Sequence, residues 1–333
     1  MTEREERRAR IGRGIELTPE QPLGEVAGLA ERAEGAGFDT ILSSCHYFNR
    51  DPFLALARIV KATEGVRVGP GVVNPYDAHP VALASRAATL QEESGGRAVF
   101  GIGAGDVSTL SALGIERDRP LRRVLEAFKM ARDLWNGESV EHDGAVTARG
   151  ARLNYEVDPL PVYVGAQGPH MLRMAAKHAD GVLYNAAHPR DVAWATERVR
   201  EGLSERPPDG GPFDFTVQAS VSVAEEASAA RETARQAAAV IAGGAAPPVL
   251  ERHGIDPDLA DEIGDLVSAG EFRAAFGTVS DPMIDAFCVA GTPADVAERL
   301  GTIREETDGV IAATPLGPDR AAAIDLLADA IVR

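Results

Sequence analysis

Glycine and proline are concentrated in one segment of this chain, at the end of an apolar run. The segment is Val68-Gly-Pro-Gly-Val-Val-Asn-Pro-Tyr76. Proline lacks the N–H that a central strand donates, and glycine weakens a strand, so this composition predicts a bulged backbone rather than a regular strand. A merely tight loop is the alternative that the spacing leaves open. Backbone of this kind often lies at a binding site.

A second glycine-rich segment is Gly101-Ile-Gly-Ala-Gly-Asp106, which also ends an apolar run. Its glycines would let a flat ring or a phosphate approach the backbone closely, and Asp106 would supply a polar group at the rim. The pattern is only part of a dinucleotide fingerprint and is therefore a weak signal. A loop without a ligand stays equally open.

A third segment, Gly165-Ala-Gln-Gly-Pro169, leads directly into a predicted helix over 170–178. The first N–H groups of a helix have no partner within it, and the helix dipole adds partial positive charge there. Pro169 suits the first helical turn, where its missing donor is not needed. We expect an anion, most simply a cofactor phosphate, with an ordinary helix start as the alternative.

Two ionisable residues stand near the ends of apolar runs. Glu16 lies in Gly14-Ile-Glu-Leu17 and either faces solvent or is held in a functional site. If it is held there, burial raises its pKa until a carboxylic acid can donate a proton near neutrality. His46 could be a proton donor, a neighbour of a bound ring or a plain surface histidine. The histidines lack the spacing of metal ligands, so no metal is expected.

Eight β-type runs alternate with helical segments, which predicts a parallel sheet wrapped by helices. The runs cover residues 11–17, 38–43, 66–73, 97–103, 161–165, 181–185, 213–223 and 309–313. Predicted helices include 22–34, 52–62, 79–93, 119–135 and 318–332. Eight such units favour an α/β fold of the (β/α)8 TIM-barrel type over an open sheet. The chemistry would then lie in the loops at the carboxyl ends of the strands.

Two stretches interrupt this alternation within what we expect to be a single barrel domain over residues 1–333. Residues 137–156 carry turn formers and weak alternation, which predicts a hairpin-like excursion. Residues 224–290 are rich in alanine and charge and predict a helical insertion between the seventh and eighth strands, with at least three helical pieces.

The bulk composition excludes some classes of partner. A net charge of −17 argues against a nucleic-acid partner, because phosphate binding needs a basic face. No run approaches the ~18 apolar residues that span a bilayer, and residues 1–8 are too charged for a signal peptide. Two cysteines give no disulfide framework. We therefore expect a soluble, cytoplasmic protein without a membrane partner.

Acidic residues number 51 against 34 basic ones, and only three of the basic residues are lysine. Such a balance is typical of halophilic proteins in a salt-rich cytoplasm, where self-repulsion is screened. A GC-rich genome that favours arginine codons, together with ordinary acidic solubility, is the alternative.

Several of these segments together resemble a known family. Ser94-Gly-Gly-Arg97 followed by Gly101-Ile-Gly-Ala-Gly105 resembles the strand-four signature of luciferase-like flavin and deazaflavin oxidoreductases. A narrower resemblance is to the coenzyme F420-dependent methylene-tetrahydromethanopterin reductases, and it covers the chain from residue 11 to the end. The motifs that carry it are Gly69–Tyr76, His79-Pro80, Gly165–Pro169, Pro247-Pro-Val-Leu-Glu-Arg-His-Gly254 and Pro315-Leu-Gly-Pro-Asp319.

The resemblance implies roles for particular residues. A non-prolyl cis peptide would fall at Gly71-Val72 and back the deazaflavin ring. Glu16 would be the acid, and Asp106 a nearby active-site carboxylate. The expected cofactor contacts are His46, Gly71, Val72, Asn74, Gly103, Gly105, Asn185 and, around the phosphate, Gly165, Ala166, Gln167 and Gly168.

The chain departs from the family pattern at two positions. Cys45 stands where an Asp is common, and Val107 stands where a Lys is common. The first departure puts in doubt any polar contact carried by that position. The second removes a basic contact to an acidic tail of cofactor or substrate, which Arg119 or Arg122 could supply instead.

The activity implied is hydride transfer from reduced coenzyme F420 to a 5,10-methylene-tetrahydropterin, either the methanopterin or the folate, to give the 5-methyl form. Alternatives are an FMN-dependent monooxygenase, another F420-dependent dehydrogenase, and a cofactor-free relative that serves as a subunit. Relatives associate through barrel helices, so a homodimer or homotetramer is expected.

Overall fold

Eight parallel strands close into a barrel, as the sequence predicts. The structure is a computed structural model that describes residues 11–332. Its barrel strands are β1 (Arg13–Glu16), β2 (Thr40–Ser43), β3 (Arg67–Pro70), β4 (Phe100–Gly103), β7 (Val162–Ala166), β8 (Gly181–Asn185), β9 (Asp214–Val223) and β11 (Gly309–Leu316). They pair in the order β3-β2-β1-β11-β9-β8-β7-β4. Two parallel bridges, Val68 to Ala98 and Val73 to Ile102, join the ends and close the circle.

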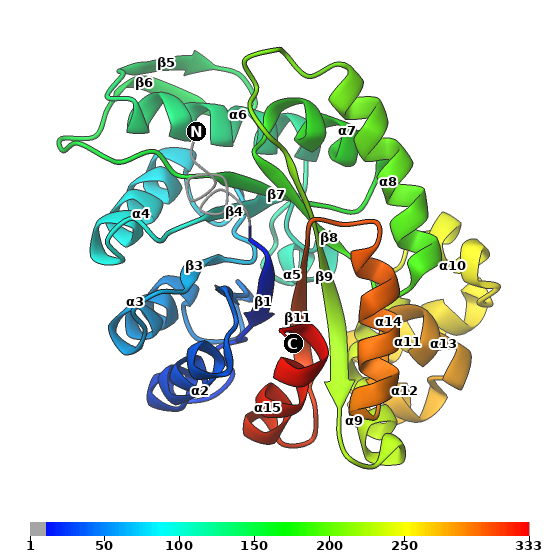
Figure 1. The fold of residues 1–333 in the computed structure, drawn as a ribbon. Helices are drawn as coiled ribbons and strands as arrows, with labels where there is room; N and C mark the ends of the chain where they lie inside the picture. Colours follow the sequence, from blue (N-terminus) through cyan, green and yellow to red (C-terminus); the bar gives the residue numbers. More distant parts are fainter. Residues whose placement is uncertain (1–10, 333) are drawn as a thin grey trace.

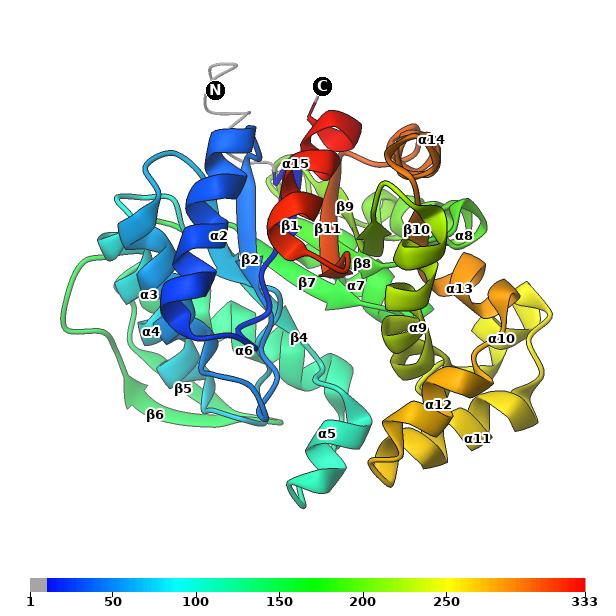
Figure 2. The same cartoon turned by 90° about the horizontal axis from the view of Figure 1, so that it is seen from below.

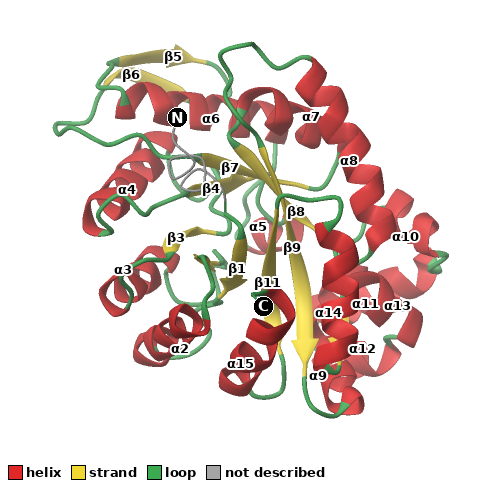
Figure 3. Cartoon of the chain, viewed as in Figure 1, coloured by secondary structure: helices red, strands yellow, loops and turns green. Residues whose placement is uncertain are grey.

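Helices surround the strands on the outside (Figures 1 and 3). They are α2 (Leu23–Ala36), α3 (Pro52–Ala62), α4 (Pro80–Glu93), α6 (Pro120–Trp135), α7 (Pro169–His178), α8 (Pro189–Ser204), α14 (Pro293–Arg304) and α15 (Arg320–Ile331). Several of these helices begin with a side-chain cap. Asp51, His79, Thr292 and Asp319 each accept a backbone N–H of the first turn. Helix α2 ends at Gly37, which adopts φ 95° and belongs to the glycine-containing stop that the sequence indicates at residues 35–37.

Side chains fill the interior of the barrel from its amino end to the level of Leu42. The cluster comprises Ile11, Leu42, Val99, Tyr163, Leu183 and Ile311. The hydroxyl of Tyr163 donates to the buried carboxylate of Asp214 at 2.7 Å, and the backbone N–H of Ile11 donates to the same oxygen at 2.8 Å. In barrels of this type, ligands bind at the carboxyl ends of the strands.

The two predicted interruptions have defined structures. Strands β5 (Val140–Asp143) and β6 (Thr147–Ala151) form an antiparallel hairpin beside α6. The insertion holds α9 (Ala227–Gly243), α10 (Pro247–His253), α11 (Pro257–Ser268), α12 (Phe272–Thr278) and α13 (Asp281–Phe287), which share a separate apolar cluster. A short strand that the sequence did not predict, β10 (Val289–Gly291), then pairs in parallel with the end of β9. Figure 2 shows the insertion and the short helix α5 (Val107–Ala112) projecting from the same end of the barrel.

One motif of the sequence anchors this insertion to the barrel. In Pro247–Gly254, His253 Nε2 lies 2.7 Å from the carboxylate of Asp191, and Arg252 also binds that carboxylate. Asp191 is buried in the first turn of α8, directly after the end of β8. Burial raises the pKa of this carboxyl, but the hydrogen bonds from His253 and Arg252 outweigh it and hold the pKa below its ordinary value. The insertion is therefore tied to the carboxyl end of the barrel by a buried ion pair.

Among residues 11–332, no helix combines the length and apolarity that a membrane span requires. The same part of the chain contains no group of three or more His, Cys, Asp or Glu side chains arranged to hold a metal ion. The charged N-terminal stretch over residues 1–8 lies outside the described residues.

Candidate active site

Glu16 is the last residue of β1 and lies buried at the carboxyl end of the barrel, with 5% of its surface exposed. Its Oε1 accepts the hydroxyl of Thr18 at 2.7 Å, and its Oε2 accepts the side-chain amide of Gln218 at 2.5 Å. Burial raises the pKa of Glu16 above its ordinary value, although hydrogen bonds from Thr18, Ser44 and Gln218 act in the opposite direction. Of the two sequence-based alternatives for Glu16, exposure to solvent is therefore wrong. The raised pKa favours the protonated carboxyl, which is the form that can donate a proton.

The bulge predicted after the third strand is present. Strand β3 ends at Pro70, and the peptide bond Gly71-Val72 just beyond it is cis, where the resemblance implies it. A Cβ added at Gly71 would lie 3.1 Å from Cβ of Leu42 and 3.7 Å from Oε1 of Gln218. Gln218 of β9 thus binds the buried acid on β1, and its side-chain oxygen lies on the side of Gly71 where a Cβ would stand.

The glycines of the second loop have a packing role around this bulge. A Cβ at Gly101 would lie 2.0 Å from the carbonyl oxygen of Pro70. A Cβ at Gly103 would lie 2.7 Å from Cγ2 of Val72, and one at Gly165 would lie 3.0 Å from the same atom. The side chain of Val72 therefore needs glycine on two neighbouring strands. Close approach of a ligand to Gly103 or Gly165 stays a prediction, because the packing of Val72 alone already accounts for glycine at both positions.

Asn74 joins the loops that follow three strands. It is buried, and its Oδ1 accepts the backbone N–H groups of Tyr76 at 3.0 Å and Asp77 at 3.1 Å. Its Nδ2 donates to the hydroxyl of Tyr47, and a Cβ at Gly105 would lie 3.1 Å from its Cγ. Asn74 therefore fixes the shape of the barrel mouth, whether or not it also touches a cofactor.

Tyr47 was not predicted as a site residue. Its only signal in the sequence is its place beside His46. Burial raises the pKa of Tyr47 to about 12, so the phenol stays protonated at neutral pH and can donate a hydrogen bond.

Asp106 is exposed and forms the N-terminal cap of α5, a helix that the sequence did not predict. Its Oδ1 accepts the hydroxyl of Ser108 at 2.6 Å and the backbone N–H of Thr109 at 2.8 Å. Partial burial raises the pKa of this carboxyl, but those hydrogen bonds outweigh it and lower the pKa below its usual value. These contacts are those of a helix cap, and a catalytic role for Asp106 stays a prediction.

His46 lies in the loop after β2, close enough to Asp106 for the two side chains to attract each other electrostatically. The imidazole is exposed and packs edge-on against Phe48, with ring centroids 5.3 Å apart. Phe48 is itself 64% exposed, so the rim of the mouth carries an aromatic side chain that faces solvent. The position fits a ring neighbour and also a surface histidine.

Helix α7 begins with free backbone donors, as predicted. Gly168 occupies the N-cap position of this helix and has no side chain that could accept from its first N–H groups. A Cβ at Gly168 would meet nothing within 4 Å, so there is open space in front of these donors. Gln167 and Gly168 are exposed, whereas Ala166 is buried at the end of β7. This geometry suits a bound anion.

Asn185 is exposed at the end of β8 and lies in register with Gln218 on the neighbouring strand. Gln218 in turn binds Glu16. The predicted cofactor residue Asn185 is therefore placed beside the same group of side chains as the buried acid.

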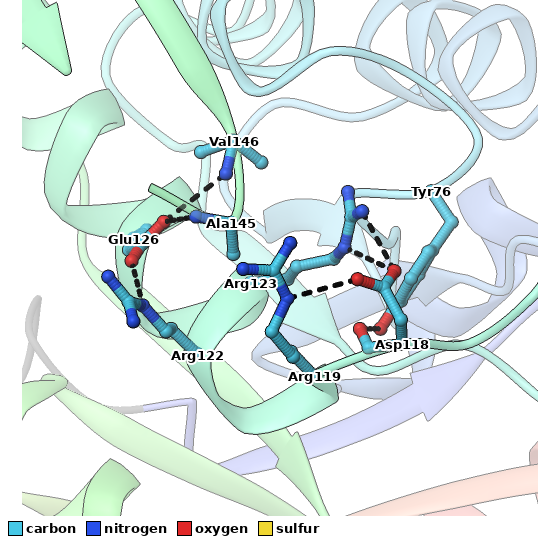
Figure 4. A network of polar contacts seen from close by, with 8 residues as sticks. All are labelled: Tyr76, Asp118, Arg119, Arg122, Arg123, Glu126, Ala145 and Val146. Atoms are coloured by element: carbon cyan, nitrogen blue, oxygen red, sulfur yellow. Dashed lines mark hydrogen bonds and ion pairs between the residues drawn. The ribbon is translucent and has the colours of Figure 1, made fainter. Parts of the chain in front are cut away.

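A network of arginines and carboxylates covers the start of α6 (Figure 4). Asp118 forms ion pairs with Arg119 at 3.1 Å and with Arg123 at 2.8 Å, and its backbone carbonyl accepts the hydroxyl of Tyr76 at 2.6 Å. Arg122 pairs with Glu126 at 2.5 Å. Both arginines expected to compensate for the missing lysine are thus engaged with carboxylates, although their side chains remain more than half exposed. Their contact to an acidic tail stays a prediction.

The two positions expected to depart from the family pattern carry no charge. Cys45 is half-buried, and burial, reinforced by the carboxylates of Asp77 and Asp51, raises the pKa of its thiol to about 12. The thiol is therefore neutral at neutral pH. Val107 opens α5 and is 51% exposed, so an apolar side chain faces solvent there.

A closed eight-stranded barrel with a buried acid, a cis bulge and a free helix start at one mouth defines a class of α/β oxidoreductase. The family model described as luciferase-like monooxygenase matches residues 9–308, so the chain belongs to the luciferase-like family. Within that family the chain is 38% identical to the 5,10-methylenetetrahydromethanopterin reductase of Archaeoglobus fulgidus over 325 residues, which cover 96% of this chain and 98% of the relative.

Two further comparisons agree with this one. The reductase of the same name from Methanolobus tindarius is 36% identical, over 96% of this chain and 99% of its own. The solved structure of the coenzyme F420-dependent tetrahydromethanopterin reductase from Methanopyrus kandleri superposes with a TM-score of 0.88 at 32% identity, covering 97% of this chain and 99% of that one. The chain is a homologue of the F420-dependent methylenetetrahydromethanopterin reductases.

Proposed function

We propose that the protein uses coenzyme F420 to reduce a 5,10-methylene-tetrahydropterin to its 5-methyl form. The observation that carries this proposal is the position of Gln218, which donates to Glu16 and whose side-chain oxygen would lie 3.7 Å from a Cβ at Gly71. A proton donor and a backbone platform therefore lie in one mouth of the barrel. Reduction of a C–N bond needs both a proton and a hydride, and this arrangement provides for the two together. The nearly full-length similarity to reductases of that name supports the choice.

The residues around the bulge fit the cofactor. The cis bulge at Gly71-Val72 would support the face of a planar ring, and the uncapped N–H groups at Gly168 would hold the phosphate of the cofactor tail. Asn185 would bind nearby through its exposed amide. When bound, reduced coenzyme F420 supplies a hydride, and the protein contributes orientation and electrostatics.

Glu16 would supply the proton. Burial raises the pKa of its carboxyl above that of an exposed glutamate, which favours the protonated form. Gln218 fixes Oε2 and Thr18 fixes Oε1, so the carboxyl has one orientation toward the mouth. Protonation of a nitrogen that flanks the methylene carbon makes that carbon a better hydride acceptor. The acid therefore acts before or during hydride transfer.

Methanopterin and folate both carry the methylene carbon between two nitrogens, so the groups around Glu16 serve either substrate. The folate is a serious candidate for a chain this acidic, if its source accumulates salt and makes no methane. Purified protein should be titrated with reduced F420 and assayed with each methylene-pterin, in dilute buffer and in molar salt. Turnover of one substrate supports the reductase and identifies the pterin. Inactivity with both in all conditions would refute the proposal.

The description of the matching family names monooxygenases, which makes FMN the alternative cofactor. Absorption spectra of the protein mixed with F420 and with FMN distinguish the two, and an oxygen electrode provides a second measurement. Retention of FMN with oxygen consumption would favour the monooxygenase.

A further inference from the structure

A proton donor at Glu16 has to be reprotonated after each turnover. It is almost completely buried, and the mouth beside it is where cofactor and substrate would sit. After one proton transfer the carboxylate must regain a proton, and bulk water reaches only a small part of its surface. A group other than the ligands in the mouth has to connect it to solvent.

Three hydroxyl groups provide such a connection. Thr18 Oγ1 donates to Glu16 Oε1 at 2.7 Å, Ser44 Oγ donates to Thr18 Oγ1 at 3.1 Å, and Thr314 Oγ1 lies 2.7 Å from Thr18 Oγ1. Thr18 and Ser44 lie just beyond the carboxyl ends of β1 and β2, and Thr314 lies within β11 near its carboxyl end. Strand β1 lies between β2 and β11 in the sheet. Since Thr18 has a single hydroxyl proton and directs it at Glu16, Thr314 must be the donor to Thr18. Both outer hydroxyls are therefore oriented toward the acid through Thr18.

The two outer hydroxyls of this group reach solvent, whereas the central hydroxyl of Thr18 does not. Thr18 is buried, but Ser44 and Thr314 are only half-buried. A narrow gap between β1, β11, α2 and α15, too small to hold a water molecule, is lined by Glu16, Thr18, Thr314 and Arg320. Exchange with water is therefore assigned to the half-buried outer hydroxyls of Ser44 and Thr314.

We propose that Ser44, Thr18 and Thr314 form a hydroxyl relay that returns a proton to Glu16 after each turnover. This inference rests on the proposed function, because it assigns the proton supply of the acid in that same site. The O–H bond of Thr18 breaks as its proton moves to Oε1 of Glu16, and a new O–H bond forms on Thr18 with a proton from Ser44 or Thr314. That hydroxyl is restored from water. Cofactor and substrate exchange the electrons, so the relay consumes one proton from water and no reductant.

The test compares Thr18→Val, which keeps the shape and removes the hydroxyl, with Thr18→Ser, which keeps the hydroxyl. The turnover of each variant is measured in H2O and in D2O with reduced F420 and the methylene-pterin that the wild-type protein reduces. Thr18→Val should lower kcat at least about tenfold and enlarge the solvent isotope effect, since general acid catalysis contributes on the order of 10²–10⁴ in rate. KM should change little. Thr18→Ser should stay close to the wild-type values.

The outer hydroxyls give a second, independent measurement that leaves Thr18 in place. Ser44→Ala and Thr314→Val should each have a small effect, because either hydroxyl can replace the other. The double variant should approach Thr18→Val, and this comparison decides the matter if Thr18→Val does not fold.

Wild-type kcat and isotope effect in Thr18→Val, or an effect on KM alone, would overturn the relay. So would a loss of activity that Thr18→Ser shares in full, because that indicates a structural role. A wild-type protein that reduces neither pterin would instead refute the proposed function, and the relay with it.

Discussion

The side-chain amide of Gln218 donates to Oε2 of Glu16 at 2.5 Å, although 202 positions separate the two residues in the chain. The contact joins the first and the seventh barrel strands, β1 and β9, which lie on either side of β11. It holds the acid in one orientation, and it lowers the pKa of Glu16 against the larger effect of burial. Removal of this amide is therefore a test of what positions the acid.

Gln218→Leu should raise the pKa of Glu16 further, because a hydrogen bond that favours the ionised form is lost. An acid that must be protonated for turnover then stays active to higher pH, while misorientation lowers kcat on the order of tenfold. The pH dependence of kcat measures both effects. Gln236→Leu on the exposed face of α9 is the control. An alkaline limb that does not move would contradict the coupling.

Glu16→Gln should remove most turnover and make the fold more stable at neutral pH. The folded pKa of Glu16 lies above its unfolded value, so its contribution to stability is complete below the unfolded pKa and is lost as pH rises through the folded pKa. The amide stays neutral throughout. The melting temperatures of variant and wild type should therefore agree near pH ~4, close to the unfolded pKa of glutamate, and diverge above it. A constant difference in melting temperature across pH would contradict the raised pKa.

Gly168→Asp tests the anion site at the start of α7. The new side chain has open space and can cap the helix, so the free energy of unfolding should stay level or rise by a few tenths of a kcal/mol. Its negative charge would face the phosphate of the cofactor, and the Kd for F420 should increase at least about tenfold. Gly168→Asn caps without charge and is the matched control. Equal affinity in Asp and Asn variants, measured by fluorescence titration, would remove the phosphate from this position.

Gly103→Ala tests the packing of the bulge. The added methyl group would lie 2.7 Å from Cγ2 of Val72 and should cost about 1–3 kcal/mol of unfolding free energy. Val72→Ala removes that atom, so the double variant should recover part of the loss in a double-mutant cycle. Gly35→Ala, where a Cβ meets nothing within 4 Å, is the control. Additive losses in urea denaturation would show that Gly103 and Val72 do not oppose each other.

The barrel strands were predictable because each is a short apolar run bounded by turn residues. The same local signals placed the bulge after Pro70 and the free start of α7 at Gly168. Helix α5 was missed, since six residues after a glycine-rich segment carry too little periodicity to distinguish a helix from a loop. Strand β10 was missed because three residues give no alternation.

The partners of the site residues were harder to predict than the residues themselves. Glu16 could be singled out from its apolar surroundings, but Gln218 is an ordinary glutamine within a strand, and only the closure of the barrel brings it to Glu16. Tyr47 becomes visible only through its contact with Asn74. Contacts across many strands depend on register and barrel tilt, which a single sequence does not encode locally.

The glycine at position 101 makes room for the carbonyl of Pro70, and those at 103 and 165 make room for Val72 of the cis bond. Their spacing therefore has a cause in the shape of the neighbouring bulge, which would hold with or without a guest molecule. Any barrel that keeps such a kink would need equivalent gaps, whether it hosts a flavin, a deazaflavin or nothing. For genome-wide assignment, this signature would recognise the scaffold, and the choice of coenzyme has to be sought in the helix start after Gly168 and in the rim.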